Sequence, residues 1–201
     1  MLLLYPTYFP SISQFAALAQ ADAVTLEVCD SFQKQTNRNR MYIYSPNGRQ
    51  LLNVPVKHDL GRRMTRDVRV DNSFGWQKQH FKSLEAAYRS SPFFEYFEDD
   101  IAPVFTKRHE FLMDLDLETM EIVSRCMGLD FKFRKTVEYF HQVADSKDIR
   151  HMASGKKDTS QLEPYTQVFG DRHGFLNNLS VLDLLFNEGR HARDYLLRQV
   201  I

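Results

Sequence analysis

The sequence predicts an α/β fold, with an N-terminal Rossmann-like βαβ core, a β-hairpin insertion and a largely helical C-terminal half. Three observations support this prediction. An apolar run, a helical pattern and a second apolar run follow one another within the first 28 residues. A turn sequence containing proline and glycine then separates two strand-like stretches. Amphipathic segments of helical period dominate the remainder.

The predicted βαβ unit begins the chain. Leu2–Tyr5 and Ala23–Val28 are its two strands, and Ser11–Ala21 is its helix, with Ser11 as the N-cap. A crossover of this kind makes the two strands parallel neighbours. Ligands of such units bind at the carboxyl ends of the strands, which are the loops that follow Tyr5 and Val28. Neither loop carries a glycine-rich phosphate motif.

A β-hairpin is predicted after this unit. Met41–Tyr44 and Leu51–Val56 are its arms, and Pro46 and Gly48 take the second and last positions of a type I turn. Thr65–Val70 is a further candidate strand.

The C-terminal half is predicted to be mainly helical. They are predicted at Trp76–Ser91, in an acidic region after it, at Leu117–Leu129 with Gly128 at its end, at Asn177–Gly189 and at Arg190–Ile201. Lys132–Phe140 and Tyr165–Phe169 have strand-like composition, and the polar segment Asp145–Glu163 is predicted to be a mobile loop.

Length and composition place limits on the class of protein. The 201 residues suit a single domain, with an α/β part over about 1–75 and a helical part over about 76–201. Two distant cysteines, no leader and no apolar stretch of spanning length favour a cytoplasmic protein. The formal net charge of zero argues against general nucleic-acid binding. The dispersed histidines give no metal-site spacing, and no particular cofactor is indicated.

The stretch "TNRNR" is the strongest candidate binding site. It lies in a basic region, since residues 34–69 hold nine Lys or Arg against two Asp. In an extended chain Arg38 and Arg40 share one face and Asn37 and Asn39 the other, so the two guanidiniums form a fork suited to phosphate or carboxylate. The alternative is a solvated strand edge with surface ion pairs.

Further candidates lie in the loops and on one helix. Asp30, at the end of the second strand, is a candidate for catalysis or for capping a turn, and Tyr8 in the first loop is a candidate substrate contact. His80 and Trp76 share a helix face, where Trp76 is a candidate substrate contact and His80 suits general acid–base catalysis or a backbone-bonded structural role.

Two more expectations concern charged residues. Asp148 and Arg150 either close over substrate or form an ordinary exposed pair. Asp183 lies three residues after Ser180, the spacing of a capping box, and a structural role at a helix start is favoured for it.

Four stretches together resemble one bacterial family. They are "YPTYFPSISQFAALAQAD", "TNRNRMYI…NGRQLLNVPV", "W…H…SLEAAYRSSPFFEYF" and "YTQVFGDRHGFLNNLSVLDLLFNEG", in this order. The chain is similar over nearly its whole length to the WbqC-like proteins, which occur in O-antigen gene clusters. The resemblance implies a transferase of surface-polysaccharide synthesis, for example one that adds an amino acid, such as glycine, or an acyl group to an amino sugar.

Three functions follow as hypotheses. The first is a transferase that binds a phosphorylated or nucleotide-linked sugar through Arg38 and Arg40, with Asp30 and His80 as catalytic candidates. The second is a nucleotidyltransferase- or ligase-like enzyme, although the first loop lacks the histidines that such enzymes use. The third is a non-enzymatic binding subunit, with "SPFFEYFEDD" and the C-terminal helices as the interface of a homodimer.

Overall fold

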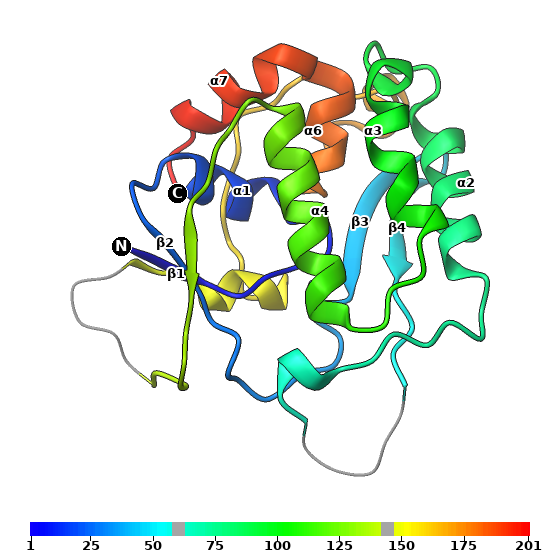
Figure 1. Cartoon of the computed structure of the whole chain (residues 1–201). Coiled ribbons are helices and arrows are strands. Elements are labelled where there is room, and N and C mark those ends of the chain that lie inside the picture. Colours follow the sequence, from blue (N-terminus) through cyan, green and yellow to red (C-terminus); the bar gives the residue numbers. More distant parts are fainter. Residues whose placement is uncertain (58–62, 142–146) are drawn as a thin grey trace.

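A parallel β-sheet forms one side of the protein in the computed structural model, which describes residues 1–57, 63–141 and 147–201. Its strands are β1 (Leu2–Leu4), β2 (Val24–Leu26), β5 (Phe133–Lys135) and β6 (Lys147–Asp148), in the order β5-β2-β1-β6 (Figure 1). All three pairings are parallel. β1 is apolar and fully buried, whereas β6 at the edge of the sheet is exposed.

The predicted βαβ unit is confirmed. β1 pairs with β2 from Leu2↔Val24 to Leu4↔Leu26, and helix α1 (Ile12–Ala19) connects them. The elements are shorter than expected by one to three residues at their ends. Ser11 takes the N-cap position of α1, but its hydroxyl lies 3.1 Å from that of Ser13 and makes no capping bond.

The predicted hairpin is also confirmed, although its second arm begins and ends three residues earlier than the predicted Leu51–Val56. β3 (Arg40–Ser45) pairs antiparallel with β4 (Gly48–Asn53), and Pro46 and Asn47 form the turn between them. Gly48 has φ +95°, a conformation that favours glycine, so its place at the end of the turn has a physical reason.

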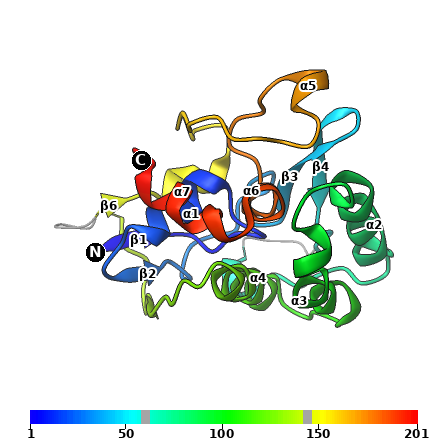
Figure 2. The ribbon, with the colours of Figure 1, turned by 90° about the horizontal axis from the view of Figure 1, so that it is seen from above.

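Helix α6 (Val181–Glu188) lies at the centre of the molecule. It contacts α1, α3, α4, α7 and β3, and its residues from Val181 to Asn187 are buried. The parallel sheet and the hairpin lie on opposite sides of it (Figure 2). The remaining helices are α2 (Trp76–Tyr88), α3 (Phe94–Thr106), α4 (Leu112–Cys126), α5 (Gly170–His173) and α7 (Ala192–Arg198).

Three predicted segments differ in the structure. Thr65–Asp67 is a short 3-10 helix, η1, and only isolated bridges such as Arg69↔Phe111 follow it. Tyr165–Phe169 contains no strand. The described part of the predicted loop over 145–163 contains β6 and a 3-10 helix, η2 (Arg150–Ser154).

Asp183 is not part of a capping box. Ser180 does cap α6, since its hydroxyl accepts a bond from the Leu182 amide. The Asp183 carboxylate instead lies fully buried and accepts bonds from Tyr88 Oη at 2.8 Å, from Gln167 Nε2 at 3.0 Å and from Tyr165 Oη. The two tyrosines and the glutamine satisfy a carboxylate that would otherwise be costly to bury.

None of the helices in the described residues is long and apolar enough to cross a membrane.

Candidate functional site

The loops at the carboxyl edge of the parallel sheet enclose a small polar cavity. β1 has β2 on one side and β6 on its other side. Successive strands are therefore added on both sides of β1, and the strand order reverses there. Ligands of open parallel sheets bind in the crevice at such a point. A cavity of about 330 Å³ lies here, which we call the edge cavity. It is lined by Tyr5, Gln33, Arg38, Tyr139, Asp148, Arg150, His151, Ser154 and Lys157.

A buried ion pair supports one wall of the edge cavity. Arg38 Nη2 lies 2.5 Å from Asp30 Oδ2, and the two residues are 1% and 4% exposed. The Arg38 guanidinium also stacks on the Tyr5 ring, 3.9 Å from its centroid. Burial raises the pKa of Asp30, and the Arg38 charge opposes that shift. A guanidinium at hydrogen-bond distance from a carboxylate forms a charge-assisted pair.

Arg150 forms the wall that follows β6. Its Nη2 lies 2.6 Å from Asp148 Oδ2, its Nη1 donates to the Phe140 carbonyl at 2.6 Å, and Glu27 Oε2 is 3.6 Å from Nη1. Hydrogen bonds from Arg150 hold the pKa of Asp148 below its ordinary value, in opposition to burial. The two residues therefore form a fixed pair at the cavity wall.

A second cavity of about 250 Å³ lies beside the first, and we call it the cationic cavity. Four stretches that are distant in sequence form it: the end of the first loop, the "TNRNR" turn with the hairpin, the end of η2 with the two residues after it, and the turn before α6. Its lining residues are Phe9, Ser11, Gln35, Asn37, Arg40, Met41, Tyr42, Arg49, Ser154, Gly155, Lys156, Asn178, Leu179 and Ser180.

The charges in this cavity are of one sign. Arg40, Arg49 and Lys156 line it, and no acidic residue is among the described residues of its wall. Arg40 Nε donates to Asn53 Oδ1 at 3.2 Å, and Arg49 stacks over the Tyr42 ring at 4.2 Å. Neither contact neutralises charge, so the cavity favours an anionic ligand.

Strained backbone gathers at the cationic cavity. In the described residues, the three non-glycine residues with positive φ are Phe9 (40°), Gln35 (63°) and Asn178 (55°), and all three line it. Left-handed φ values are uncommon for non-glycine residues, especially bulky ones, and cluster at functional sites when the surrounding structure enforces them. Tertiary contacts supply that enforcement here, since Ser180 Oγ donates to the Phe9 carbonyl at 3.1 Å.

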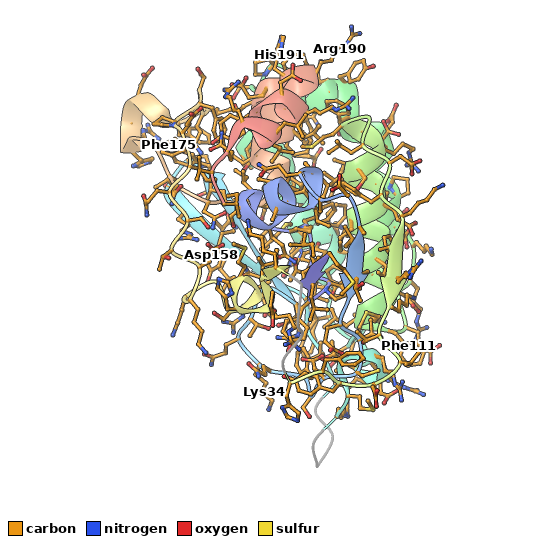
Figure 3. All side chains as sticks on the ribbon, turned by 90° about the vertical axis from the view of Figure 1, so that its left-hand side faces the viewer. Lys34, Phe111, Asp158, Phe175, Arg190 and His191 are labelled. Atoms are coloured by element: carbon orange, nitrogen blue, oxygen red, sulfur yellow. The ribbon has the colours of Figure 1, made fainter. Side chains whose placement is uncertain are left out.

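Asp158 holds Asn178 at the cavity wall. Its Oδ2 accepts bonds from Asn178 Nδ2 at 2.7 Å and from Ser13 Oγ at 2.5 Å. Asn178 Oδ1 in turn accepts the Ser13 amide at 3.0 Å. Figure 3 shows Asp158 on the segment that runs from η2 towards α5. The Asp158 carboxylate thus accepts hydrogen bonds from neighbouring neutral side chains and is not paired with the cations of the cavity.

The predicted arginine fork does not form. Arg38 lines the edge cavity, whereas Arg40 lines the cationic cavity. The alternation expected of a strand fails because residues 37–39 lie in a turn and β3 begins only at Arg40. Asn37 lines the cationic cavity, whereas Asn39 is buried and donates to the Val54 carbonyl at 2.9 Å.

Tyr8, His80 and Trp76 meet in the interior. The Tyr8 hydroxyl lies 3.0 Å from His80 Nδ1, and the three side chains are 0%, 4% and 3% exposed. None of them lines either cavity. Burial lowers the pKa of His80 to about 4, so its ring is neutral at pH 7. A catalytic role for His80 remains a prediction that requires ligand access to this interior position.

Several lining residues have only weak sequence signals. Lys156 follows Ser154 and Gly155 in a polar segment, and a glycine followed by lysines is the signal that marks it. Arg49 looks like an ordinary hairpin residue, and Tyr5 looks like the end of a buried strand. These residues meet only through the tertiary structure. No group of three or more His, Cys, Asp or Glu side chains in the described ranges is placed to hold a metal ion.

The protein is thus an α/β protein with two adjoining cavities beside its parallel sheet, one of them lined by cations. The chain is a member of the WbqC-like protein family, whose sequence profile it matches over residues 5–159. It is also 26% identical to the uncharacterized protein Rv1507c of Mycobacterium tuberculosis, over 94% of each chain. No solved structure matches it significantly.

Proposed function

We propose that the protein is a transferase of surface-polysaccharide synthesis that binds a phosphorylated or nucleotide-linked sugar, with the phosphate in the cationic cavity. The observation that carries the proposal is the meeting of Arg40, Arg49 and Lys156 with the strained residues Phe9 and Asn178 at one cavity. The resemblance of the chain to proteins of O-antigen gene clusters supports the sugar as the rest of the ligand.

The lining of the cavity suits phosphate oxygens. Two guanidiniums and one ammonium provide charge-assisted donors, each worth roughly 1.5–3 kcal/mol when the bond is formed away from water. The amide groups of Asn37 and Gln35 add neutral donors at the same wall. Since Arg49 and Lys156 are exposed and come from different segments, the hairpin and the turn after η2, they can contact an anion without breaking an ion pair in the described structure.

Asp30 is the better placed of the two catalytic candidates. Its carboxylate contacts Arg38, which lines the edge cavity, and burial raises its pKa while the Arg38 charge opposes that shift. His80 lies away from both cavities and is neutral at pH 7. General acid–base catalysis by Asp30 or His80 is part of the proposed function.

A nucleotidyltransferase-like reaction is a second candidate. The cationic cavity includes Phe9 and Ser11 from the loop between β1 and α1, and the first loop of a parallel sheet is where nucleotide phosphates often bind. Exchange of pyrophosphate into ATP, measured with the purified protein, would favour this reaction over sugar transfer. A protein that binds these ligands without any turnover would instead be a binding subunit, which is the third hypothesis.

A thermal-shift screen tests the leading function. The ligands are nucleotide sugars, sugar phosphates, and acyl and aminoacyl donors, and a ligand at 100 times its Kd stabilises a protein by about 2.7 kcal/mol. We expect stabilisation by phosphorylated sugars that is lost in an Arg49→Ala, Lys156→Ala double variant. The matched control is Lys57→Ala, Arg108→Ala, which removes two exposed cations from another cavity. Equal losses in both double variants, or no stabilisation by any phosphorylated ligand, would contradict the proposal.

A further inference from the structure

The two cavities adjoin and are nevertheless chemically distinct. Consecutive residues divide them, since Asn37 lines the cationic cavity and Arg38 the edge cavity, and Ser154 lines both. The Asn37 amide donates to the Ala153 carbonyl at 2.7 Å. This bond holds the turn that separates the two cavities against η2. A ligand group in one cavity therefore lies next to a group in the other.

The guanidiniums of the edge cavity are already compensated. Arg38 is paired with Asp30 at 2.5 Å, and Arg150 with Asp148 at 2.6 Å and with Glu27 at 3.6 Å. An anion could bind these arginines only by competing with a carboxylate that is already in place. The remaining lysine, Lys157, is exposed. It is the one Lys or Arg side chain of the edge cavity without an ion pair in the described structure, whereas the cationic cavity has three such side chains.

Its surface combines aromatic rings with neutral polar groups. Arg38 stacks on the Tyr5 ring, and burial together with the Asp30 charge raises the pKa of Tyr5, so its hydroxyl stays neutral. The Tyr139 side chain is 39% exposed and adds a second ring. Gln33 and Ser154 contribute groups that both donate and accept hydrogen bonds. A sugar ring offers the matching surfaces, because it has apolar C–H faces and a rim of hydroxyl groups.

We infer that the edge cavity binds a neutral sugar ring, as a second ligand site separate from the phosphate site in the cationic cavity. The inference rests on the proposed function only where it assigns this ring to the acceptor of the transfer. A sugar in the edge cavity and a phosphate group beside Ser154 would then be neighbours, which is the arrangement that a transfer between two bound substrates needs.

Saturation-transfer NMR with two double variants tests the inference. The probes are methyl glycosides of hexoses, deoxyhexoses and N-acetylhexosamines, and separately inorganic pyrophosphate. Gln33→Ala, Tyr139→Ala removes two side chains of the edge cavity that are exposed, so the variant should fold, and its melting curve checks this. Arg49→Ala, Lys156→Ala alters the cationic cavity alone.

We expect at least one glycoside to bind the wild type, and its affinity to fall about tenfold or more in the edge-cavity variant, a loss of about 1.4 kcal/mol. The affinity of the same glycoside for the cationic-cavity variant should stay within about twofold of its affinity for the wild type. Absence of binding by every glycoside, or equal losses in both variants, would overturn the inference. If glycosides bind as expected and pyrophosphate does not bind, the proposed phosphate site fails and the sugar site stands.

Discussion

The Tyr8 hydroxyl lies 3.0 Å from Nδ1 of His80, deep between the first loop and helix α2. Both side chains are buried, and Trp76 packs edge-on against the His80 ring, with centroids 5.2 Å apart. Burial lowers the pKa of His80 from 6.5 to about 4. A neutral imidazole paired with a tyrosine is thus part of the core that holds the loop after β1.

The stability of the protein should fall with acid in the range set by His80. The unfolded chain binds the proton with a pKa of 6.5 and the folded chain only at about 4, so stability present above pH 6.5 is lost as the pH falls towards 4. The shift corresponds to about 3 kcal/mol at 1.36 kcal/mol per pKa unit. Urea unfolding from pH 4 to pH 7.5 measures this loss.

A His80→Gln variant isolates the contribution of this histidine. Its stability at pH 7 should be lower than that of the wild type, and its decline between pH 6.5 and pH 4 should be shallower by about 2–3 kcal/mol. An identical pH profile in both proteins would show that the folded state protonates His80 freely.

The two arginines of "TNRNR" should differ sharply in their effect on folding. Arg38→Ala leaves the buried Asp30 carboxylate unpaired, which costs about 3–5 kcal/mol. Arg40→Ala removes a half-exposed side chain whose one hydrogen bond within the described residues is to Asn53, and it should cost about 0–1 kcal/mol. The alternation in "TNRNR" predicts one common face for the two arginines, whereas Arg38 is buried and Arg40 is not. Equal unfolding free energies for the two variants would count against the buried pair.

The Asp183 network should contribute strongly to stability. Tyr88 Oη donates to Asp183 Oδ1 at 2.8 Å and accepts the Tyr44 amide at 3.0 Å. Tyr88→Phe leaves both partners short of a bond in a buried site, at a cost of about 1.5–3 kcal/mol. The control is Tyr96→Phe on the exposed surface, where the change should stay within about 0.5 kcal/mol. Chemical denaturation compares the two, and a similar small effect in both would refute the network.

Gly155 should be required for the shape of the cationic cavity. It has φ +64°, and a Cβ there would lie 3.2 Å from Asn37 Oδ1. Gly128 has the same φ but no atom within 4 Å of its Cβ position, so Gly128→Ala is a matched control for backbone strain. Both variants should lose about 1–2 kcal/mol of stability.

Only Gly155→Ala should also weaken phosphate binding, because the Asn37 side chain must move. Calorimetric titration with pyrophosphate provides the comparison. Equal affinity in the two glycine variants would mean that Asn37 does not take part in the site.

The parts of the fold that the sequence predicts are those with local signals. β1 and β2 are apolar runs, and Pro46 and Gly48 define the hairpin turn by their own backbone preferences. β6 has no such signal. Lys147 and Asp148 are exposed polar residues that form a strand only because their backbone pairs with Leu2 and Leu3.

The site was harder to predict for the same reason. Arg38 and Arg40 alternate in sequence, but the turn at residues 37–39 directs them to different cavities. Arg49, Lys156 and Asn178 are far apart in the chain and meet only when the hairpin, η2 and the turn before α6 pack together. Asp30 lies near the carboxyl edge of the sheet as expected, because strand topology alone determines that position.

Locating a bound phosphate group on the protein tests whether the cationic cavity is a phosphate site. Pyrophosphate is titrated into the 15N-labelled protein, and the amide resonances are followed by two-dimensional NMR. We expect the largest shifts on the amides of Gln35, Asn37, Gly155 and Asn178, and we expect them to vanish in the Arg49→Ala, Lys156→Ala variant. Shifts centred instead on Lys57 and Arg108, or no shifts at millimolar pyrophosphate, would contradict a phosphate site in the cationic cavity.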